Sequence, residues 1–289
     1  MQTTERYCMG CMRDNGGETI CRFCGFNESR PHEAFALPLR SWLAGRYMTG
    51  AIKDLNGEGI TYIAWDSVQQ EPVFIREYFP QGFCERYLRL SGVKIHRDQA
   101  KTYDEGMDAF ISLAEDLSRM GALQGLLPVR DIFEDNGTAY YAYESVESIK
   151  LKEFLLRNGG TLKWDQARPL FLSIIPTLTA LHGAGILHCG ISHDTLLVGR
   201  DGKMRVTGFC IEQVRNARSD FKSQLFSGYA AIEQYGFKGQ IGSATDVYAL
   251  GAAIYRTLVG RPPPPATERV TDDRMTIPYF IAQNLPEDV

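Results

Sequence analysis

Hydrophobic and polar positions alternate over several short stretches between residues 46 and 145. These stretches are rich in β-branched and aromatic residues, and turn residues such as Gly, Asn and Asp separate them. The alternation predicts a mostly antiparallel sheet. The stretches read RYMTGAIKD, GITYIAWD, PVFIREYF, LPVRDIFED and TAYYAYES.

Helical spacing interrupts the sheet pattern once, over residues 102–121. There Phe110, Leu113, Leu117 and Met120 fall on one stripe, which predicts an amphipathic helix. The second half of the chain is mainly helical in pattern.

Two longer helical segments dominate that second half. Residues 164–185 carry an apolar face, and Pro176 should kink this helix or be absorbed near a turn. Residues 243–260 are apolar on nearly all sides and open with a capping pattern from Ser243 to Asp246, which predicts a helix in the middle of a lobe. A sheet-rich first half and a helix-rich second half predict an α+β, two-lobed fold with a ligand cleft between the lobes.

Composition and charge narrow the functional classes. The 289 residues are 44% apolar with a net charge of −4, so there is enough apolar material for two lobes and no overall basic field for nucleic acid. No stretch approaches the roughly 18 to 20 apolar residues of a membrane span, and the start lacks a signal-peptide core. We therefore predict a cytoplasmic chain without a membrane segment and without a nucleic-acid partner.

The first 24 residues contain two C-x-x-C pairs, Cys8 with Cys11 and Cys21 with Cys24. Turn residues between the pairs allow a hairpin to bring four thiolates to one tetrahedral ion, which is typical of structural zinc. The alternatives are incidental cysteines or a redox motif, and the strand and helix that a redox motif needs are missing from the pattern. We predict a zinc ribbon whose metal has no catalytic role.

From about residue 40 to the end, the order of segments resembles a protein kinase domain, and in detail bacterial serine/threonine kinases with an N-terminal zinc ribbon. The matching stretches are GITYIAWD, REYFP, NGTAYYAYES, LHGAGILHCGISHDTLLV, SGYAAIEQYG and DVYALGAAIYRTLVGRPPPPATERVTDD. The resemblance implies a zinc ribbon at 1–34, a linker at 35–44, an N-lobe at 45–146, and a C-lobe at 147–289 whose last helices are missing.

Phosphoryl transfer in this family needs charged and metal-binding residues at fixed positions, and this chain departs from the family at each of them. Arg76 stands at the position of the phosphate-binding lysine, and Leu113 at that of its glutamate partner. Gly190 replaces the catalytic aspartate, while Thr195 and Gly208 replace the two principal metal ligands. The resemblance therefore implies no catalytic residues at these positions and argues against ATP and Mg²⁺ as cofactors.

The resemblance also implies an occluded nucleotide cleft. Asp54 and Asn56 replace two glycines of the phosphate loop, and Phe74 replaces the alanine that lies over adenine. Tyr143 and Leu197 are the other bulky residues assigned to this cleft. The alternative for Phe74 and Tyr143 is ordinary packing in a strand.

Positions that support the family's fold are retained. His188 and Phe209 match a stacked pair, and Asp246 matches the residue that accepts backbone hydrogen bonds from the catalytic loop. A sequence that keeps the fold-supporting residues of the family but not its catalytic residues suggests that the surface of the fold still has a function.

We therefore predict a pseudokinase, not an enzyme, that acts as a signalling scaffold or regulatory module for protein partners. One alternative is a serine/threonine kinase homologue that retains ATP binding or weak atypical phosphotransfer, using Arg76 with Asp194 or Glu212. Another is a zinc-ribbon interaction module that the kinase fold supports. A third is a nucleophile or soft-metal site formed by Cys189, His193 and Cys210.

Overall fold

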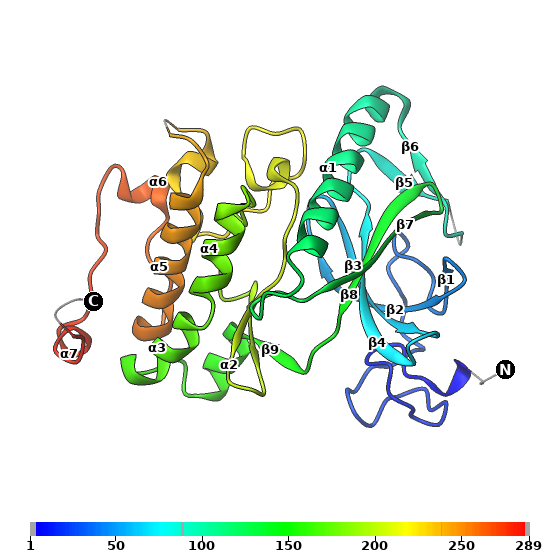
Figure 1. The fold of residues 1–289 in the computed structure, drawn as a ribbon, viewed down its shortest axis with the longest axis horizontal. Coiled ribbons are helices and arrows are strands. Elements are labelled where there is room, and N and C mark those ends of the chain that lie inside the picture. Colours follow the sequence, from blue (N-terminus) through cyan, green and yellow to red (C-terminus); the bar gives the residue numbers. More distant parts are fainter. Residues whose placement is uncertain (1–3, 88–89, 238, 287–289) are drawn as a thin grey trace. The chain divides into compact units, whose positions relative to one another are not determined.

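The computed structural model describes residues 4–87, 90–237 and 239–286. The chain divides into two compact units: unit 1, Met1–Arg119 with Pro128–Ser145, and unit 2, Met120–Leu127 with Val146–Val289. Figure 1 shows a sheet and one long helix in unit 1 and mainly helices in unit 2. The predicted α+β architecture, with a sheet-rich lobe and a helical lobe, is confirmed.

Unit 1 is built on a six-stranded antiparallel sheet with the strand order β1-β2-β3-β4-β8-β7. All five predicted strands are present, and the structure adds short strands that hold too few residues for a period-2 pattern. The sheet consists of β1 (Trp42–Leu43), β2 (Tyr47–Leu55), β3 (Gly59–Asp66), β4 (Glu71–Tyr78), β7 (Val129–Asp135) and β8 (Thr138–Glu144), and a separate hairpin consists of β5 (Cys84–Arg86) and β6 (Val93–Ile95).

The one long helix of unit 1, α1 (Ala100–Arg119), packs against β7 and β8. Its buried positions recur every three or four residues, which is the spacing of one helix face. They are Tyr103, Gly106, Phe110, Ala114 and Leu117. The predicted stripe is therefore right at Phe110 and Leu117. It is wrong at Leu113, which is half-buried, and at Met120, which follows the end of the helix.

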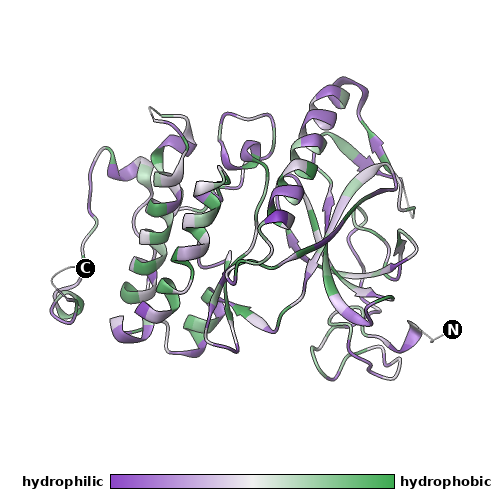
Figure 2. Cartoon of the chain, viewed as in Figure 1, coloured by the Kyte–Doolittle hydropathy of each residue, from purple (hydrophilic) through white to green (hydrophobic). Residues whose placement is uncertain are grey.

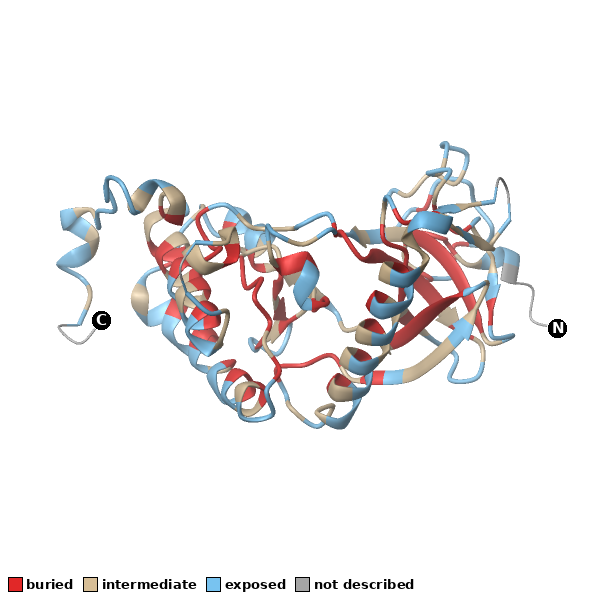
Figure 3. Ribbon diagram, turned by 90° about the horizontal axis from the view of Figure 1, so that it is seen from above, coloured by how far each residue is buried: buried red, intermediate tan, exposed pale blue. Residues whose placement is uncertain are grey.

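Side chains alternate along β4, so two neighbouring charged residues lie on opposite faces of the sheet. Arg76 pairs with Thr61 of β3 and Tyr141 of β8. Directly paired residues of antiparallel strands share a face, which we call the Arg76 face. Glu77 lies on the other face. Both charged residues are buried, with Arg76 3% and Glu77 0% exposed, and Figure 3 shows the strands of the sheet largely in red.

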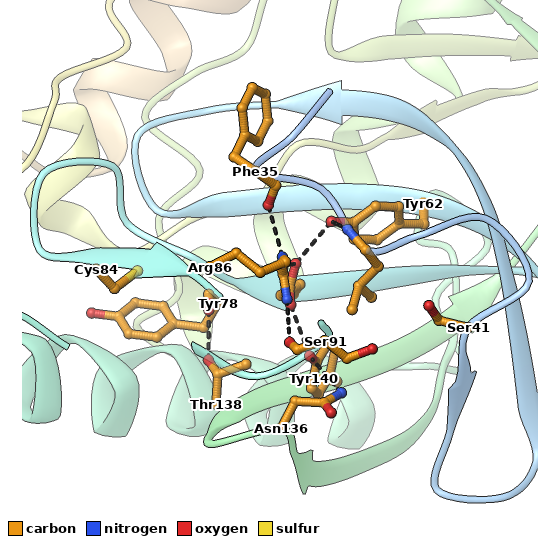
Figure 4. A network of polar contacts seen from close by, with 12 residues as sticks. Phe35, Ser41, Tyr62, Tyr78, Cys84, Arg86, Ser91, Asn136, Thr138 and Tyr140 are labelled. Carbon is orange, nitrogen blue, oxygen red and sulfur yellow. Dashed lines mark hydrogen bonds and ion pairs between the residues drawn. The ribbon is translucent and has the colours of Figure 1, made fainter. Parts of the chain in front are cut away.

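Glu77 is the centre of a buried polar network on its face of the sheet. Figure 4 shows its partners Arg86, Tyr62 and Tyr140. Arg86 Nη2 lies 2.7 Å from Glu77 Oε2. The hydroxyls of Tyr62 and Tyr140 donate to the same carboxylate at 2.9 and 2.7 Å. The carboxylate is thus paired with a cation and hydrogen-bonded, as a buried charge must be.

The same network holds the segment that precedes the sheet, within the range 35–44 predicted as a linker. Arg86 Nε donates to the Phe35 carbonyl at 2.8 Å. The Leu37 N–H donates to the Tyr62 hydroxyl at 3.0 Å. Strand β1 lies in the same range and pairs with β2. These residues are therefore an integral part of unit 1.

Unit 2 is a set of helices around α5 (Ser243–Val259), which Figure 2 shows mostly in hydrophobic green. The other helices are α2 (Leu151–Arg157), α3 (Trp164–Leu172), α4 (Ile175–Gly183), α6 (Ala266–Arg269) and α7 (Tyr279–Ala282). A small sheet of order β11-β10-β9, absent from the sequence prediction, is formed by β9 (Ser148–Lys150), β10 (Leu196–Gly199) and β11 (Met204–Val206). Across residues 4–87, 90–237 and 239–286, no helix has the length and apolar character that crossing a bilayer requires.

The helix predicted over residues 164–185 is two helices. α3 ends at Leu172 and α4 begins at Ile175, with Pro176 in its first turn, where the missing N–H leaves no hydrogen bond unmade. The Ser173 hydroxyl donates to the Leu170 carbonyl at 2.6 Å at the break. Pro176 is therefore absorbed in the first turn of a second helix and does not kink a continuous one.

The capping pattern predicted from Ser243 to Asp246 is wrong. The Thr245 hydroxyl accepts the Gly242 N–H at 3.2 Å at the start of α5. The carboxylate of Asp246 is instead fully buried and bonded to the loop that follows α4. Its role lies in that loop and not in capping.

We predict that separating Glu77 from Arg86 strongly destabilises unit 1. Glu77→Gln or Arg86→Met leaves one charge buried without its partner and should lower the free energy of unfolding by about 3–5 kcal/mol in urea denaturation. The double variant should cost clearly less than the sum of the two single variants. The matched control is Lys94→Ala, which breaks the exposed Lys94–Glu85 pair of the same 2.7 Å length and should leave the unfolding midpoint unchanged. If the loss of unfolding free energy in the double variant equals the sum of the two single losses, the two residues are not coupled and the prediction is wrong.

Candidate functional site

Four cysteine sulfurs converge in the N-terminal segment of unit 1. Cys8 Sγ lies 3.7 Å from Cys24 Sγ, and Cys11 Sγ lies 3.8 Å from Cys21 Sγ. All four sulfur atoms lie within 4.8 Å of one another. The residues that the C-x-x-C spacing singled out are therefore brought together.

The cysteine cluster fits a tetrahedral metal ion such as zinc. With Zn–S bonds of about 2.3 Å, the sulfur–sulfur edges of a tetrahedron are about 3.8 Å long, close to the separations of the Cys8–Cys24 and Cys11–Cys21 pairs. The Gly10 N–H donates to Cys8 Sγ at 3.2 Å and the Phe23 N–H to Cys21 Sγ at 3.4 Å. Such bonds favour thiolates, but burial outweighs them at Cys8 and raises its pKa. Burial acts to raise the pKa of Cys21, but N–H groups of Phe23 and Cys24 outweigh it and lower the pKa to about 7.

We predict that the purified chain contains about one zinc ion, measured by inductively coupled plasma mass spectrometry. Cys11→Ser removes one of four ligands and should lower zinc content and the thermal stability of unit 1, because binding energy of such an ion is folding energy. Cys84→Ala removes a cysteine outside the cluster and should retain the metal. Iron in place of zinc, or a metal-free chain that takes up no zinc, would contradict this assignment.

A second candidate site surrounds Arg76. Its Nη1 donates to the Thr61 hydroxyl at 3.0 Å, and its Nη2 contacts Asn56 Oδ1 and lies 3.2 Å from Glu58 Oε1. Burial acts to lower the pKa of Arg76, but the Glu58 carboxylate raises it above the ordinary value. The guanidinium is therefore a fixed, buried cation.

The turn between β2 and β3, which the resemblance identifies as the phosphate loop, is closed by its own side chain. Asn56 Oδ1 accepts the N–H groups of Glu58 and Gly59, each at 3.1 Å. Backbone N–H groups of such turns are the donors that bind phosphate oxygens elsewhere. Asp54 pairs with Thr61 in the strand register and adds a negative charge to the turn. A phosphate must therefore compete with Asn56 for these donors.

Glu58, which the sequence analysis did not single out, is the acidic partner of Arg76. Leu113 of α1 has no charge to offer, and the Glu115 carboxylate lies 3.9 Å from Arg119 on an exposed part of the helix. One feature of the sequence could have identified Glu58: it is an acidic residue in the turn NGEG, directly before a strand that is buried almost throughout. In this chain the countercharge comes from the turn and not from the helix.

Phe74 and Tyr143 are neighbours on the Arg76 face, with ring centroids 5.4 Å apart. Phe74 also packs against a buried cluster formed by Met9, Met12, Met48 and Ile63. Leu197, the other residue assigned to the nucleotide cleft, lies half-buried on β10 of unit 2. That Phe74 fills a base pocket stays a prediction.

In unit 2, the buried carboxylate of Asp246 holds the loop after α4. The His188 N–H donates to Oδ2 at 2.9 Å and the Cys189 N–H to Oδ1 at 2.6 Å. The His188 ring contacts Phe209 edge to face, with centroids 4.6 Å apart. The roles predicted for His188, Phe209 and Asp246 are confirmed.

Gly190 leaves a space that a buried arginine occupies. A Cβ atom at position 190 would collide with the guanidinium of Arg215. Arg215 is 1% exposed and donates to the carbonyls of Gly208 at 2.7 Å and Gln224 at 3.0 Å. The position at which the family keeps an aspartate therefore faces a cation.

Thr195 and Gly208 do not fit as ligands of Mg²⁺. The Thr195 hydroxyl donates to the Gly190 carbonyl at 2.7 Å and accepts the Ser192 N–H at 2.8 Å. Gly208 has a φ of 79°, and a Cβ there would lie 2.9 Å from Thr195 Cγ2. Mg²⁺ requires oxygen ligands, usually carboxylates, in octahedral geometry. Positions 190, 195 and 208 therefore offer no protein anchor for this ion.

Cys189, His193 and Cys210 do not form a nucleophile or soft-metal site. Burial raises the pKa of the Cys189 thiol, which keeps it protonated and a poor nucleophile. The His193 ring stacks on Tyr229 with centroids 5.2 Å apart. Within the described residues, these three side chains do not assemble as a metal-ligating group, whereas the four N-terminal cysteines do.

Comparisons with known proteins agree with this geometry. The family model described as "Protein kinase domain" matches residues 94–285. The chain is 26% identical over 219 residues to Sperm motility kinase 2B of Mus musculus, covering 72% of this chain and 44% of that protein. It is 26% identical over 216 residues to a probable serine/threonine-protein kinase of Clostridium perfringens, covering 71% and 31%. A solved structure titled "PpkA-294 apo form" matches with a TM-score of 0.72 at 27% identity, covering 86% of this chain and 88% of that chain.

A sheet-rich lobe, and a helical lobe in which Asp246 holds the loop after α4, define a kinase-like protein. The chain belongs to the protein kinase domain family. The aligned part spans less than half the length of the curated relatives named here. The prediction that the chain is not an enzyme is contradicted, because these relatives are named as kinases and no comparison indicates a loss of activity.

The buried imidazole of His188 predicts a pH dependence of stability. Burial, and then the positive charge of Arg215, lower its pKa from 6.5 to about 4. The unfolded chain therefore binds this proton at higher pH than the folded chain, and the free energy of unfolding should fall between about pH 6.5 and pH 4, by on the order of 3 kcal/mol. His188→Phe keeps a ring against Phe209 but does not titrate, so urea denaturation across this range should show a smaller loss. Equal losses in both proteins would contradict the assignment to His188.

Proposed function

We propose that this chain is an atypical serine/threonine protein kinase homologue that binds a nucleoside triphosphate weakly and transfers phosphate slowly, with a structural zinc ion in its N-terminal segment. The family match over residues 94–285 supports the class of reaction. The observation that carries the proposal is the fixed guanidinium of Arg76, at the strand position where the resemblance places the phosphate-binding lysine. An arginine there keeps the positive charge that phosphate oxygens require.

Binding is weak because the phosphate-binding groups already have partners inside unit 1. Glu58 and Asn56 bind the guanidinium of Arg76. Asn56 also accepts the backbone N–H groups of the turn. A phosphate must displace these bonds, and it gains only the difference between the new contacts and the old ones.

Transfer is slow because the usual carboxylates are absent at positions 190 and 208. We propose Asp194, the one carboxylate in the sequence of the loop 188–195, as the group that accepts the proton of the attacking hydroxyl. Its carboxylate is 30% exposed and lies 3.7 Å from Lys152 Nζ. A well-placed general base contributes roughly 10²–10⁴-fold. Because Asp194 does not occupy position 190, it should replace only part of this contribution, and we expect a rate below the 1–100 s⁻¹ of typical kinases.

The test measures binding and transfer separately. Millimolar ATP should raise the melting temperature of the wild-type chain in a concentration-dependent manner, because a ligand of the folded state must stabilise it. Incorporation of radiolabelled γ-phosphate should be slow but measurable, and Asp194→Asn should reduce it about tenfold or more while keeping the thermal shift. The matched control, Asp165→Asn on the exposed surface of α3, should change neither quantity.

Two results would overturn this proposal. One is a melting temperature that ATP does not change at any concentration, with or without Mg²⁺. The other is label incorporation that is absent, which would remove the proposed transfer, or equal in wild type and Asp194→Asn, which would remove the proposed base.

We further propose that the chain acts together with protein partners. Large apolar side chains are exposed in the last part of unit 2, where Tyr279 is 77% and Phe280 69% exposed. Neighbouring exposed apolar side chains of this size are typical of surfaces that another protein covers. The chemistry expected of such a partner is an apolar surface with a polar rim.

A further inference from the structure

We propose that the turn Cys8–Met12 is a removable cover on the Arg76 face, and that the metal held by the four cysteines keeps it in place. Zinc loading would then regulate access of nucleotide phosphates to Arg76. This inference rests on the proposed function, because it concerns regulation of the same site. The cover itself follows from contacts within unit 1.

The sheet side of the contact lies on the Arg76 face. Ile63 pairs with Phe74, which is two residues from Arg76 on β4 and therefore on the same face. Met48 pairs with Trp65, which is two residues from Ile63 on β3. The cluster of Met48 and Ile63 thus continues the face that carries Arg76.

The ribbon side of the contact consists of the two methionines of the cysteine turn. Met9 is 0% and Met12 2% exposed, and both pack in one buried cluster with Met48 and Ile63. Methionine fills irregular apolar gaps well, which suits a contact between a turn and a twisted sheet. Phe74 packs against the same cluster.

Aromatic and backbone contacts extend this interface. The rings of Tyr7 and Trp65 stack with centroids 4.4 Å apart. The Ala51 N–H of β2 donates to the Met9 carbonyl at 2.7 Å, and Lys53 Nζ donates to the Gly10 carbonyl. The ribbon thereby completes hydrogen bonds that β2 would otherwise make to water.

Two of the four metal ligands, Cys8 and Cys11, belong to the same five-residue turn as the covering residues. Met9 lies between two ligands, Cys8 and Cys11, and Met12 follows the second. The Met12 N–H donates to the Cys8 carbonyl at 2.8 Å, so the turn that orients the sulfurs also orients both methionines. Small cysteine modules lose their fold without the ion, and removing zinc should therefore release the cover.

Only one end of the Arg76 face has such a removable cover. At the other end, Phe110 of the long helix α1 contacts Tyr78 and Tyr141, with ring centroids 5.5 and 5.1 Å apart. Arg76 lies between these two ends of the face. Release of the turn would expose Phe74 and the apolar surface next to Arg76 while leaving the helix in place.

The sharpest test uses a wedge between the turn and the sheet. A Cβ at Gly50 of β2 would collide with the Met9 carbonyl and the Met12 methyl group, and the backbone of Gly50 has no positive φ. Gly50→Ala should therefore displace the cover without touching a cysteine. Tyr7→Ala, which removes the stack on Trp65, is a second variant in case Gly50→Ala does not fold. Phe23→Ala, on the exposed side of the ribbon, is the matched control.

The readout is hydrogen exchange of the Ala51 amide in the full chain, measured by nuclear magnetic resonance, because this N–H donates directly to the cover. Zinc removal with a chelator, Gly50→Ala and Tyr7→Ala should each accelerate its exchange at least tenfold. Phe23→Ala should not. In a Trp42→Phe/Trp164→Phe background, acrylamide quenching of Trp65 should rise in the same three cases.

Nucleotide binding then separates this inference from the proposed function. ATP should bind several-fold more tightly to zinc-loaded Gly50→Ala than to the wild type. An Ala51 amide that stays protected after zinc removal and in both variants would overturn the cover. Faster exchange with an unchanged, measurable ATP affinity would overturn the regulation of access. Faster exchange with no ATP binding in any protein would disprove the proposed function and leave the metal-held cover standing.

Discussion

Unit 1 depends on two opposite charges that stand next to each other on β4 and are buried on opposite faces of the sheet. An unpaired buried charge would cost several kcal/mol, so each face must supply a countercharge and enough hydrogen bonds. Glu58 of a turn supplies the countercharge for Arg76, and Arg86 of a hairpin supplies it for Glu77. The alternation of a single strand thus fixes which segments must fold over each side of the sheet.

The N-terminal segment contacts both faces of this sheet. Its cysteine turn places Met9 and Met12 on the Arg76 face, while Phe35 and Leu37 bond to the network around Glu77. A segment that contacts both faces cannot act as a loose appendage. The cysteine cluster is consequently part of the stability of unit 1, and perturbing it acts on a sheet that carries the candidate nucleotide residues.

The sequence predicted the features that depend on regular spacing. Strands β2, β3, β4, β7 and β8 and helix α5 have long periodic patterns, and the cysteine cluster has a fixed spacing. The roles of Glu58 and Arg215 could not be predicted in the same way. Each is a single charged residue outside a regular strand or helix, so no periodic pattern in the sequence marks its contacts. The short strands β5, β6 and β9 to β11 hold at most four residues, too few for a pattern. The positions of Met9 and Met12 in the sequence did not indicate which surface these side chains would cover.

Each unit buries an arginine at or beside a position that the family resemblance assigns to phosphoryl transfer. In unit 1 the cation at position 76 is kept and its acid comes from a turn instead of the helix, and in unit 2 a guanidinium lies where an aspartate at position 190 would project. Arg76 and Arg215 are 3% and 1% exposed, and the hydrogen bonds of Arg215 described above go to carbonyl oxygens. Buried positive charge of this kind repels a metal cation and favours an anion. If phosphate groups bind next to Arg76, its fixed guanidinium therefore contributes to neutralising their charge, while positions 190, 195 and 208 offer no protein anchor for Mg²⁺.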